Sequence, residues 1–282
     1  MTTDTMTGPP RQAQPDALPP GLKVTQWGVL RSEWLKFWSL RSSQISVVLA
    51  VIATIGLDCL FAWAAVSNYE RLKARGAKLS DFFAADTALH AYFLVQLVVG
   101  VLGVLVVTGE YGTGMIRSSL AAAPKRLPVV WGKVIVFAVI VFVVTTISTF
   151  IGFLAAQPIL NSDSLGVSLS YPGAVRAIIG IGFYLTVIGL IGSALGWLIR
   201  HTAGALAALF GLILIAPGLG ELLPTTWQPH ILPYLPSNAG GQIASIQPDP
   251  TGLALWPAVL TVCVWLVVLF AGGILVLKRR DA

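Results

Sequence analysis

Long apolar stretches alternate with short polar segments along most of this chain. A hydrocarbon core about 30 Å thick is crossed by about 20 apolar residues of α-helix. Six stretches meet or approach that length: residues 45–66, 88–108, 134–156, 177–199, 203–223 and 254–277. The pattern therefore predicts an all-α integral membrane protein whose residues 23–282 form one domain with six transmembrane helices.

The fifth stretch is the irregular one. Residues 203–216 would make about 21 Å of helix before Pro217, Gly218 and Gly220 interrupt the pattern. We expect a broken or re-entrant helix toward the outer face here, because irregular backbone at membrane depth persists only where protein or water satisfies it. The proline-rich region that follows, residues 217–253, predicts short helices on the outer face.

Composition supports a membrane location. The chain is 56% hydrophobic and 11% charged, whereas soluble domains carry about 25% charged residues, so a water-solvated surface is excluded. The proline-rich residues 1–22 predict a disordered cytoplasmic tail, with neither a signal peptide nor a span. Cys59 and Cys263 both lie in apolar stretches, so no disulfide framework is indicated.

The distribution of Lys and Arg predicts the orientation, because cytoplasmic loops are enriched in these residues. With the N-terminus in the cytoplasm, thirteen of the 18 Lys and Arg residues fall on the cytoplasmic side. The basic loop 69–81 argues mildly against this arrangement. We expect a multi-pass protein of the cell membrane with both termini cytoplasmic. The net charge of +6 then reflects orientation, and nucleic acid is not needed as a partner.

Residues 24–44 predict an amphipathic helix ahead of the first span. Trp27, Leu30, Trp34 and Trp38 follow one another at spacings of three and four and form one face. The bases Arg31, Lys36 and Arg41 lie largely off that face. Such a helix is expected to lie in the inner interface of the lipid bilayer. The alternative is an aromatic belt on a cytoplasmic extension of the first span.

The segment 109–133, between the second and third spans, is longer than a simple connection needs. Gly109, Gly112 and Gly114 disfavour a continuous helix, and the residues after them can form a short separate helix that Pro124 ends. No GxxxxGK[ST] phosphate loop is present here or elsewhere in the chain. The segment is expected either to receive a push from another protein or only to fix topology through its bases.

The stretch EYGTGMIRSSLAAAPKRLPVVWGK, residues 110–133, resembles the corresponding loop of the ABC-2 type transporter permeases. RSEWLKFWSLRSS, residues 31–43, resembles the N-terminal amphipathic helix of that family, and the resemblance extends over residues 24–282. It implies that the loop is a coupling helix driven by a separate nucleotide-binding subunit. The residues to which the match assigns coupling roles are Glu110, Gly112, Thr113, Arg117, Leu120, Pro124, Arg126 and Lys133.

The resemblance also implies a complex. This chain would be the non-catalytic permease, paired with a second copy or a related permease, and two cytoplasmic ATP-binding cassette subunits would bind ATP and Mg²⁺. A substrate would be moved outward, and this chain would hold no cofactor or metal. The alternatives are a passive channel or membrane-anchored interaction protein, and an intramembrane enzyme. His90, His201 and His230 fall on different faces, so they cannot share a metal.

Several polar residues within the spans predict a polar layer in the outer half of the membrane. Asp58 and Gln96 both count to about 12 Å below the outer face, and ionisable groups at such depth usually face protein or water. The residues expected near this level, as a candidate substrate path, are Asp58, Gln96, Thr149, Thr186 and Thr261. The alternative is that Asp58 only helps packing.

Gly192 and Gly196 have the small-xxx-small spacing that lets helices approach closely. We expect packing within the chain, with a dimer contact as the alternative.

Overall fold

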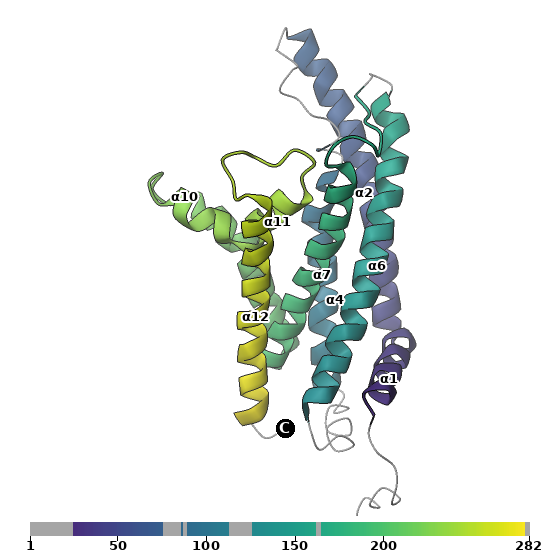
Figure 1. Cartoon of the computed structure of the whole chain (residues 1–282), viewed down its shortest axis with the longest axis vertical. Helices are drawn as coiled ribbons and strands as arrows, with labels where there is room; N and C mark the ends of the chain where they lie inside the picture. Colours follow the sequence, from purple (N-terminus) through teal and green to yellow (C-terminus); the bar gives the residue numbers. More distant parts are fainter. Residues whose placement is uncertain (1–24, 76–85, 87–88, 113–125, 162–164, 280–282) are drawn as a thin grey trace, which may run out of the picture.

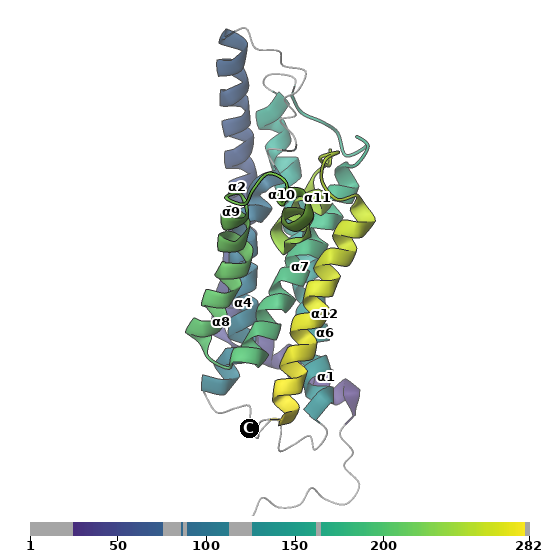
Figure 2. The same cartoon turned by 90° about the vertical axis from the view of Figure 1, so that its left-hand side faces the viewer.

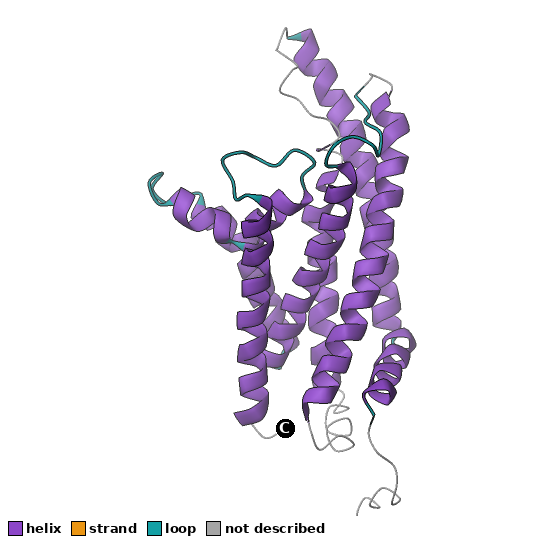
Figure 3. Ribbon diagram, in the orientation of Figure 1, coloured by secondary structure: helices purple, strands orange, loops and turns teal. Residues whose placement is uncertain are grey.

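The structure, a computed structural model, describes residues 25–75, 86, 89–112, 126–161 and 165–279. Within these ranges the chain forms helices and their connections, without a strand (Figure 3). Six helical segments are long and apolar enough to cross a membrane, namely Arg41–Ala74, Leu89–Gly112, Val130–Leu160, Ala174–Ile199, Thr202–Gly220 and Leu255–Val276. The predicted all-α fold with six such segments is confirmed, and it fits a multi-pass membrane protein. The predicted tail, residues 1–22, lies outside the described residues.

The long helices run side by side and define two ends of the bundle (Figures 1 and 2). They are α2 (Arg41–Ala74), α4 (Tyr92–Gly112), α6 (Arg126–Leu160), α7 (Ala174–Ile199) and α12 (Leu255–Arg279). The short helix α1 (Gln26–Ser39) lies at one end, together with the last turns of α12; we call this the α1 end. The short helices α10 (Gln228–Ile231), η5 (Leu232–Tyr234) and α11 (Pro236–Ala244) lie at the other, the α11 end.

Helix α7 forms the centre of the bundle, and it packs most closely against α4. Most of α7 is buried, whereas α12 and the segment Thr202–Gly220 are largely exposed. A β-carbon at Gly103 of α4 would overlap the carbonyl of Gly189, and one at Gly192 would overlap the carbonyl of Gly100. The two backbones therefore touch, which only glycine permits. The predicted spacing at Gly192 and Gly196 is thus used for packing within the chain.

The predicted amphipathic helix 24–44 is shorter than expected. Helix α1 ends at Ser39 because Leu40 takes an extended conformation, with φ −85° and ψ 117°. Arg41, which the sequence assigned to the amphipathic helix, is instead the first residue of α2. The Gln44 side chain donates to the carbonyl of Trp38 at 2.6 Å and so stabilises this corner.

The fifth span is a run of consecutive helical residues with a change of hydrogen-bonding pattern in its middle. Helix α8 (Thr202–Phe210) passes into a π-helical turn, η4 (Gly211–Ile215), and then into α9 (Ala216–Gly220). The predicted interruption is misplaced, because Pro217, Gly218 and Gly220 belong to α9, and the change of pattern occurs one turn earlier in η4. Re-entry is not confirmed, since α8 and α9 follow one another toward the α11 end (Figure 2). The following region forms the short helices α10, η5 and α11, as predicted.

The segment 109–133 is more helical than the sequence indicated. Helix α4 continues through Gly109 to Gly112, and α6 begins at Arg126. The expectation that Gly109 interrupts the helix was wrong, whereas Gly112 is the last described residue of α4 and Gly114 lies outside the described residues. Thr108 and Glu110 on either side of Gly109 are buried, and their packing outweighs the roughly 1 kcal/mol that glycine costs a helix. Residues 113–125, including the predicted short helix, lie outside the described residues.

The α4–α7 contact predicts a difference between two glycines. Gly103→Ala should lower stability by roughly 1–3 kcal/mol, because its methyl group must push the backbones apart. Gly56→Ala in α2 is the matched control: no atom lies within 4 Å of its β-carbon position, so stability should be unchanged or slightly higher. Thermal unfolding in detergent micelles measures both, and equal stability of the two variants would contradict the packing.

Candidate functional site: a buried ion cluster beside the loop 113–125

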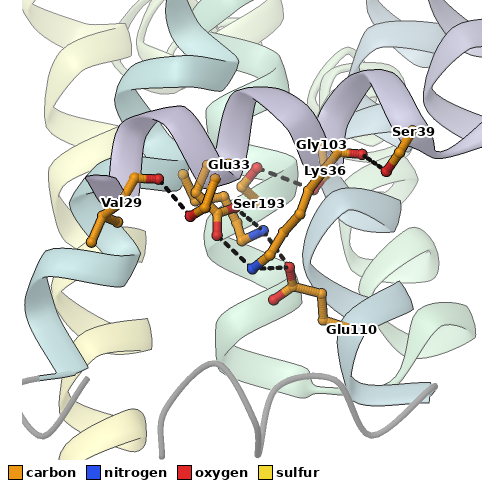
Figure 4. Close-up of polar contacts among 9 residues, drawn as sticks. Val29, Glu33, Lys36, Ser39, Gly103, Glu110 and Ser193 are labelled. Atoms are coloured by element: carbon orange, nitrogen blue, oxygen red, sulfur yellow. Dashed lines mark hydrogen bonds and ion pairs between the residues drawn. The ribbon is translucent and has the colours of Figure 1, made fainter. Parts of the chain in front are cut away.

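Four charged side chains from three helices meet inside the α1 end (Figure 4). Lys133 Nζ of α6 donates to Glu33 Oε2 of α1 and to Glu110 Oε1 of α4, each at 2.8 Å. Lys36 Nζ of α1 donates to Glu33 Oε1 at 2.7 Å and lies 3.6 Å from Glu110 Oε1. We call Glu33, Lys36, Glu110 and Lys133 the ion cluster; its two ammonium and two carboxylate groups balance in charge.

Three members of the ion cluster are almost fully removed from solvent. Glu33 and Glu110 are each 4% exposed, and Lys133 is 6% exposed. Transferring an ion out of water to this extent costs several kcal/mol unless partners compensate it. Lys133 is compensated only because two carboxylates from different helices reach its ammonium group. The pairing therefore fixes α1, α4 and α6 relative to one another.

The local sequence of α1 explains how Glu33 reaches the bundle. Val29, Glu33 and Phe37 are spaced by four residues, so they share one face of the helix, and all three are buried. The Thr25 hydroxyl accepts a hydrogen bond from Gly28 N at 3.2 Å and caps the helix start. On α6, a β-carbon at Gly132 would lie 2.6 Å from Val29 Cγ1. Glycine at this position lets α1 approach until Glu33 and Lys133 meet.

Ionisation of the cluster follows from its geometry. Burial raises the pKa of the Glu33 carboxyl, but Lys133 and Lys36 together outweigh it, and the pKa of Glu33 lies below its ordinary value of 4.5. Burial likewise lowers the pKa of Lys36, but Glu33 and Glu110 outweigh it, so the pKa of Lys36 lies above its ordinary value of 10.5. Both groups are therefore charged at neutral pH.

A second set of contacts lies at the same end, on the other side of α4. The rings of Tyr111 and Trp197 meet edge to face with centroids 6.0 Å apart, and the Arg200 guanidinium lies 5.4 Å from the Tyr111 centroid. Arg200 has a left-handed conformation with φ 59°, which ends α7, and it donates to the carbonyl of Val276 in α12 at 3.3 Å. We call Tyr111, Trp197 and Arg200 the arginine–aromatic cluster.

The last turn of α4 therefore has contacts on two sides. Glu110 joins the ion cluster with α1 and α6, while the next residue, Tyr111, joins the arginine–aromatic cluster at the end of α7. Thr202 at the start of α8 donates to the Thr108 hydroxyl at 3.0 Å. One helical turn thus contacts α1, α6, α7 and α8 directly, and it is connected to α12 through Arg200.

The predicted coupling residues are only partly within the described residues. Glu110 and Lys133 come together in the ion cluster, and Gly112 is the last residue of α4. Lys133 lies two turns inside α6 and is buried, so it is not a solvated base at the start of a span. Arg126 is the first residue of α6, but its side chain is not described. Thr113, Arg117, Leu120 and Pro124 lie outside the described residues.

The predicted interfacial residues divide into different roles. Trp27 is 76% exposed, and Trp34, Trp38 and Arg31 are also exposed, as a membrane-facing surface requires. Lys36 instead turns toward the bundle and belongs to the ion cluster.

The predicted polar layer is divided between two helix interfaces. Asp58 is 1% exposed and lies between α2 and α6, where a β-carbon at Gly152 would overlap its Oδ2 atom. Gln96 is fully buried between α4 and α7, where its side-chain carbonyl accepts a hydrogen bond from the Tyr184 hydroxyl at 2.5 Å. No hydrogen bond joins Asp58 to Gln96 among the described residues.

The three predicted threonines lie within helices. Thr149 of α6 is buried, and its hydroxyl has no hydrogen-bond partner among the described residues. Thr186 and Thr261 donate to carbonyls one turn earlier in their own helices, those of Gly182 at 2.7 Å and Pro257 at 2.8 Å. A route for substrate through these residues stays a prediction.

Sequence reasoning missed Glu33, Tyr111, Trp197 and Arg200. Glu33 had a signal: it is the only acid in an otherwise basic amphipathic helix, four residues from Val29 and from Phe37. Such a position on an apolar face indicates a carboxylate with a buried partner. The arginine–aromatic cluster had no such signal in the sequence, because its members are separated along the chain and residues of these types are common at membrane boundaries.

Comparison with known proteins adds no relative. No protein-family model matches the chain, and no curated protein matches it. Function is therefore inferred from the geometry of the α1 end, together with the resemblance of residues 110–133.

The ion cluster predicts a large effect of removing its central cation. Lys133→Met leaves two carboxylates buried without their main partner, so it should reduce stability by about 3–5 kcal/mol. Lys73→Met is the control, because Lys73 and Glu70 are 59% and 52% exposed and 3.8 Å apart; such a pair contributes about 0–1 kcal/mol. Chemical unfolding in micelles compares them, and a similar loss in both would show that burial adds nothing.

Acid should weaken the ion cluster through Glu33. The folded pKa of Glu33 is lower than the unfolded one, so its stabilisation is fully present above pH 4.5 and is lost as pH falls through the folded pKa. Between neutral pH and a pH below 4.5, Glu33→Gln should therefore lose less thermal stability than the unsubstituted chain. Exposed Glu70→Gln is the control; an acid response of Glu33→Gln equal to that of Glu70→Gln would refute this assignment.

Proposed function

We propose that this chain is the permease subunit of an ATP-binding cassette transporter of the ABC-2 type. It carries a substrate outward across the cell membrane, using ATP hydrolysed by a separate cytoplasmic subunit. The observation that carries the proposal is the double pairing of Lys133 with Glu110 and Glu33. It binds together the two helices that the loop 113–125 connects, and it binds both to α1.

A coupling element must convert a push on a loop into movement of whole helices. If α4 and α6 were joined only by a chain segment, a force on that segment would be absorbed by local bending. The buried ion cluster prevents this, because separating its groups exposes unpaired ions to an apolar interior. A push on the loop would then move α1, α4 and α6 together.

The remaining helices are reached through the other side of α4. Tyr111 and Arg200 connect its last turn to α7 and α12, and the glycine contacts at Gly100 and Gly103 continue along α7. Close-packed contacts of this kind shift between discrete arrangements and do not deform continuously. The bundle is therefore suited to alternate between two states when the loop moves.

The proposed complex contains two permeases and two ATPase subunits. The second permease is another copy of this chain or a related one, and ATP and Mg²⁺ are bound by the ATPase subunits. The α1 end, where α1 begins and α12 ends, faces the cytoplasm in this proposal, because the sequence segments assigned to that side hold most of the Lys and Arg. The buried polar residues Asp58 and Gln96 are then candidates for the substrate path.

The test separates binding of the partner from transmission of movement. A tagged chain is purified from native membranes in mild detergent, and associated proteins are identified by mass spectrometry. The unsubstituted chain should retain an ATP-binding cassette ATPase, and Arg117→Glu in the loop should lose it by charge reversal. Glu110→Gln should retain the ATPase. Because it weakens the ion cluster, it should lose the ATP-dependent change in labelling that the reporter substitution Gln247→Cys shows in the otherwise unsubstituted chain. Lys73→Glu, far from the loop, is the control and should retain both.

Two outcomes would contradict the proposal. One is that no such ATPase accompanies the unsubstituted chain, which would favour a passive channel or an interaction protein. The other concerns orientation, tested with Ser118→Cys in a background where Cys59 and Cys263 are replaced by serine. A membrane-impermeant maleimide should fail to label this cysteine in intact cells; labelling would place the loop on the wrong side for a cytoplasmic ATPase.

A further inference from the structure

An apolar groove lies between α1 and α6, and none of the four ion-cluster residues lines it. Its volume is about 560 Å³. The residues that line it include two tryptophans, three aliphatic residues and one base: Trp27, Trp34, Leu30, Ile135, Val139 and Arg31. We propose that this groove binds one anionic phospholipid, with an acyl chain between the tryptophans and α6 and the phosphate on Arg31.

The apolar part of the groove belongs to the surface that contacts the membrane. Ile135 and Val139 of α6 are 44% and 52% exposed, and they lie within the span Val130–Leu160. Trp27 and Trp34 of α1 face them across the groove. Aromatic side chains of this kind concentrate where hydrocarbon meets the headgroups. A lipid acyl chain therefore fits the apolar walls of the groove.

Charge selects the kind of lipid. Arg31 is the charged residue that lines the groove, and among the described residues it forms no ion pair. A guanidinium group binds phosphate oxygens with two parallel hydrogen bonds. Glu33, the nearest acid in the sequence, is buried, does not line the groove and is paired with Lys133. A zwitterionic headgroup would place its cation where no carboxylate lines the groove. An anionic headgroup, in contrast, has its net negative charge compensated by Arg31.

A lipid in the groove would act on the same part of α1 as the ion cluster. Arg31 and Trp34 flank Glu33 in sequence, so contacts to the lipid and to the ion cluster are made by the same two turns of α1. A bound lipid would hold α1 against α6 from outside, while Glu33 and Lys133 hold it from inside. Binding of the lipid does not depend on the proposed transport function, since it requires only that α1 lie at the membrane surface.

The experiment is native mass spectrometry of the full chain in micelles that contain equal amounts of phosphatidylglycerol and phosphatidylcholine. The unsubstituted chain should retain phosphatidylglycerol in preference by about fivefold, which corresponds to one basic residue near an anionic headgroup. Arg31→Gln should abolish the preference. Arg41→Gln is the matched control, since Arg41 is equally a surface base but does not line the groove; it should keep the preference.

A second pair of variants tests the groove itself with Arg31 in place. Val139→Trp fills the groove, and Trp27→Ala removes one wall, so both should reduce the retention of lipid; Trp38→Ala, outside the groove, should not. The proposal is overturned if Arg31→Gln keeps the preference for phosphatidylglycerol, or if Arg41→Gln loses it equally, which would indicate diffuse surface charge. It is also overturned if Val139→Trp retains as much lipid as the unsubstituted chain. None of these results would bear on the retention of an ATPase.

Discussion

The buried ammonium group of Lys133 is the constraint on which the arrangement of the α1 end depends. An ion this far from water is tolerated only when opposite charges lie within hydrogen-bonding distance. Glu33 and Glu110 meet that requirement from two different helices, each at 2.8 Å. Three helices must therefore converge at one point, and the ends of the segment that joins α4 to α6 cannot move independently. Apolar packing holds the helices together without requiring particular partners for Lys133, whereas the buried ion pairs do require them.

Helix α4 carries this constraint into the rest of the bundle. One side of its last turn holds Glu110, and the other holds Tyr111 with Arg200 stacked on its ring. Farther along, Gly103 brings its backbone against α7, where Ser193 donates to the Gly103 carbonyl at 3.1 Å. A helix held by ion pairs, ring contacts and backbone contact moves as a rigid body. This is the property that a membrane protein driven from one end would need.

Helix α1 presents two different faces, each with its own chemistry. Val29, Glu33 and Phe37 face the bundle, and the Phe37 ring meets Phe137 edge to face. Trp27, Trp34 and Arg31 are exposed and line the apolar groove. Because both surfaces belong to four turns of one helix, the proposed lipid and the ion cluster would act on the same rigid element.

The number of spans and several packing positions of this protein were determined by the sequence alone. The apolar stretches fixed six spans, because a helix in hydrocarbon must be long and apolar whatever its neighbours are. Residue spacing along single helices likewise predicted close packing at Gly192. It also predicted an exposed aromatic face formed by Trp27, Trp34 and Trp38. It failed at Gly109 and at Arg41, where local preference competed with contacts from other parts of the fold.

Only the tertiary structure decided which charges meet. Lys133 and Glu33 are 100 residues apart, and in the sequence Lys133 looks like any base at the end of a span, while Asp58 and Gln96 look like neighbours at one depth. Depth along a helix can be counted from a sequence, but rotation about its axis and the identity of the facing helix cannot. Those depend on packing of the whole bundle, which is why one apparent layer became two interfaces and one apparent loop residue became the centre of a buried cluster.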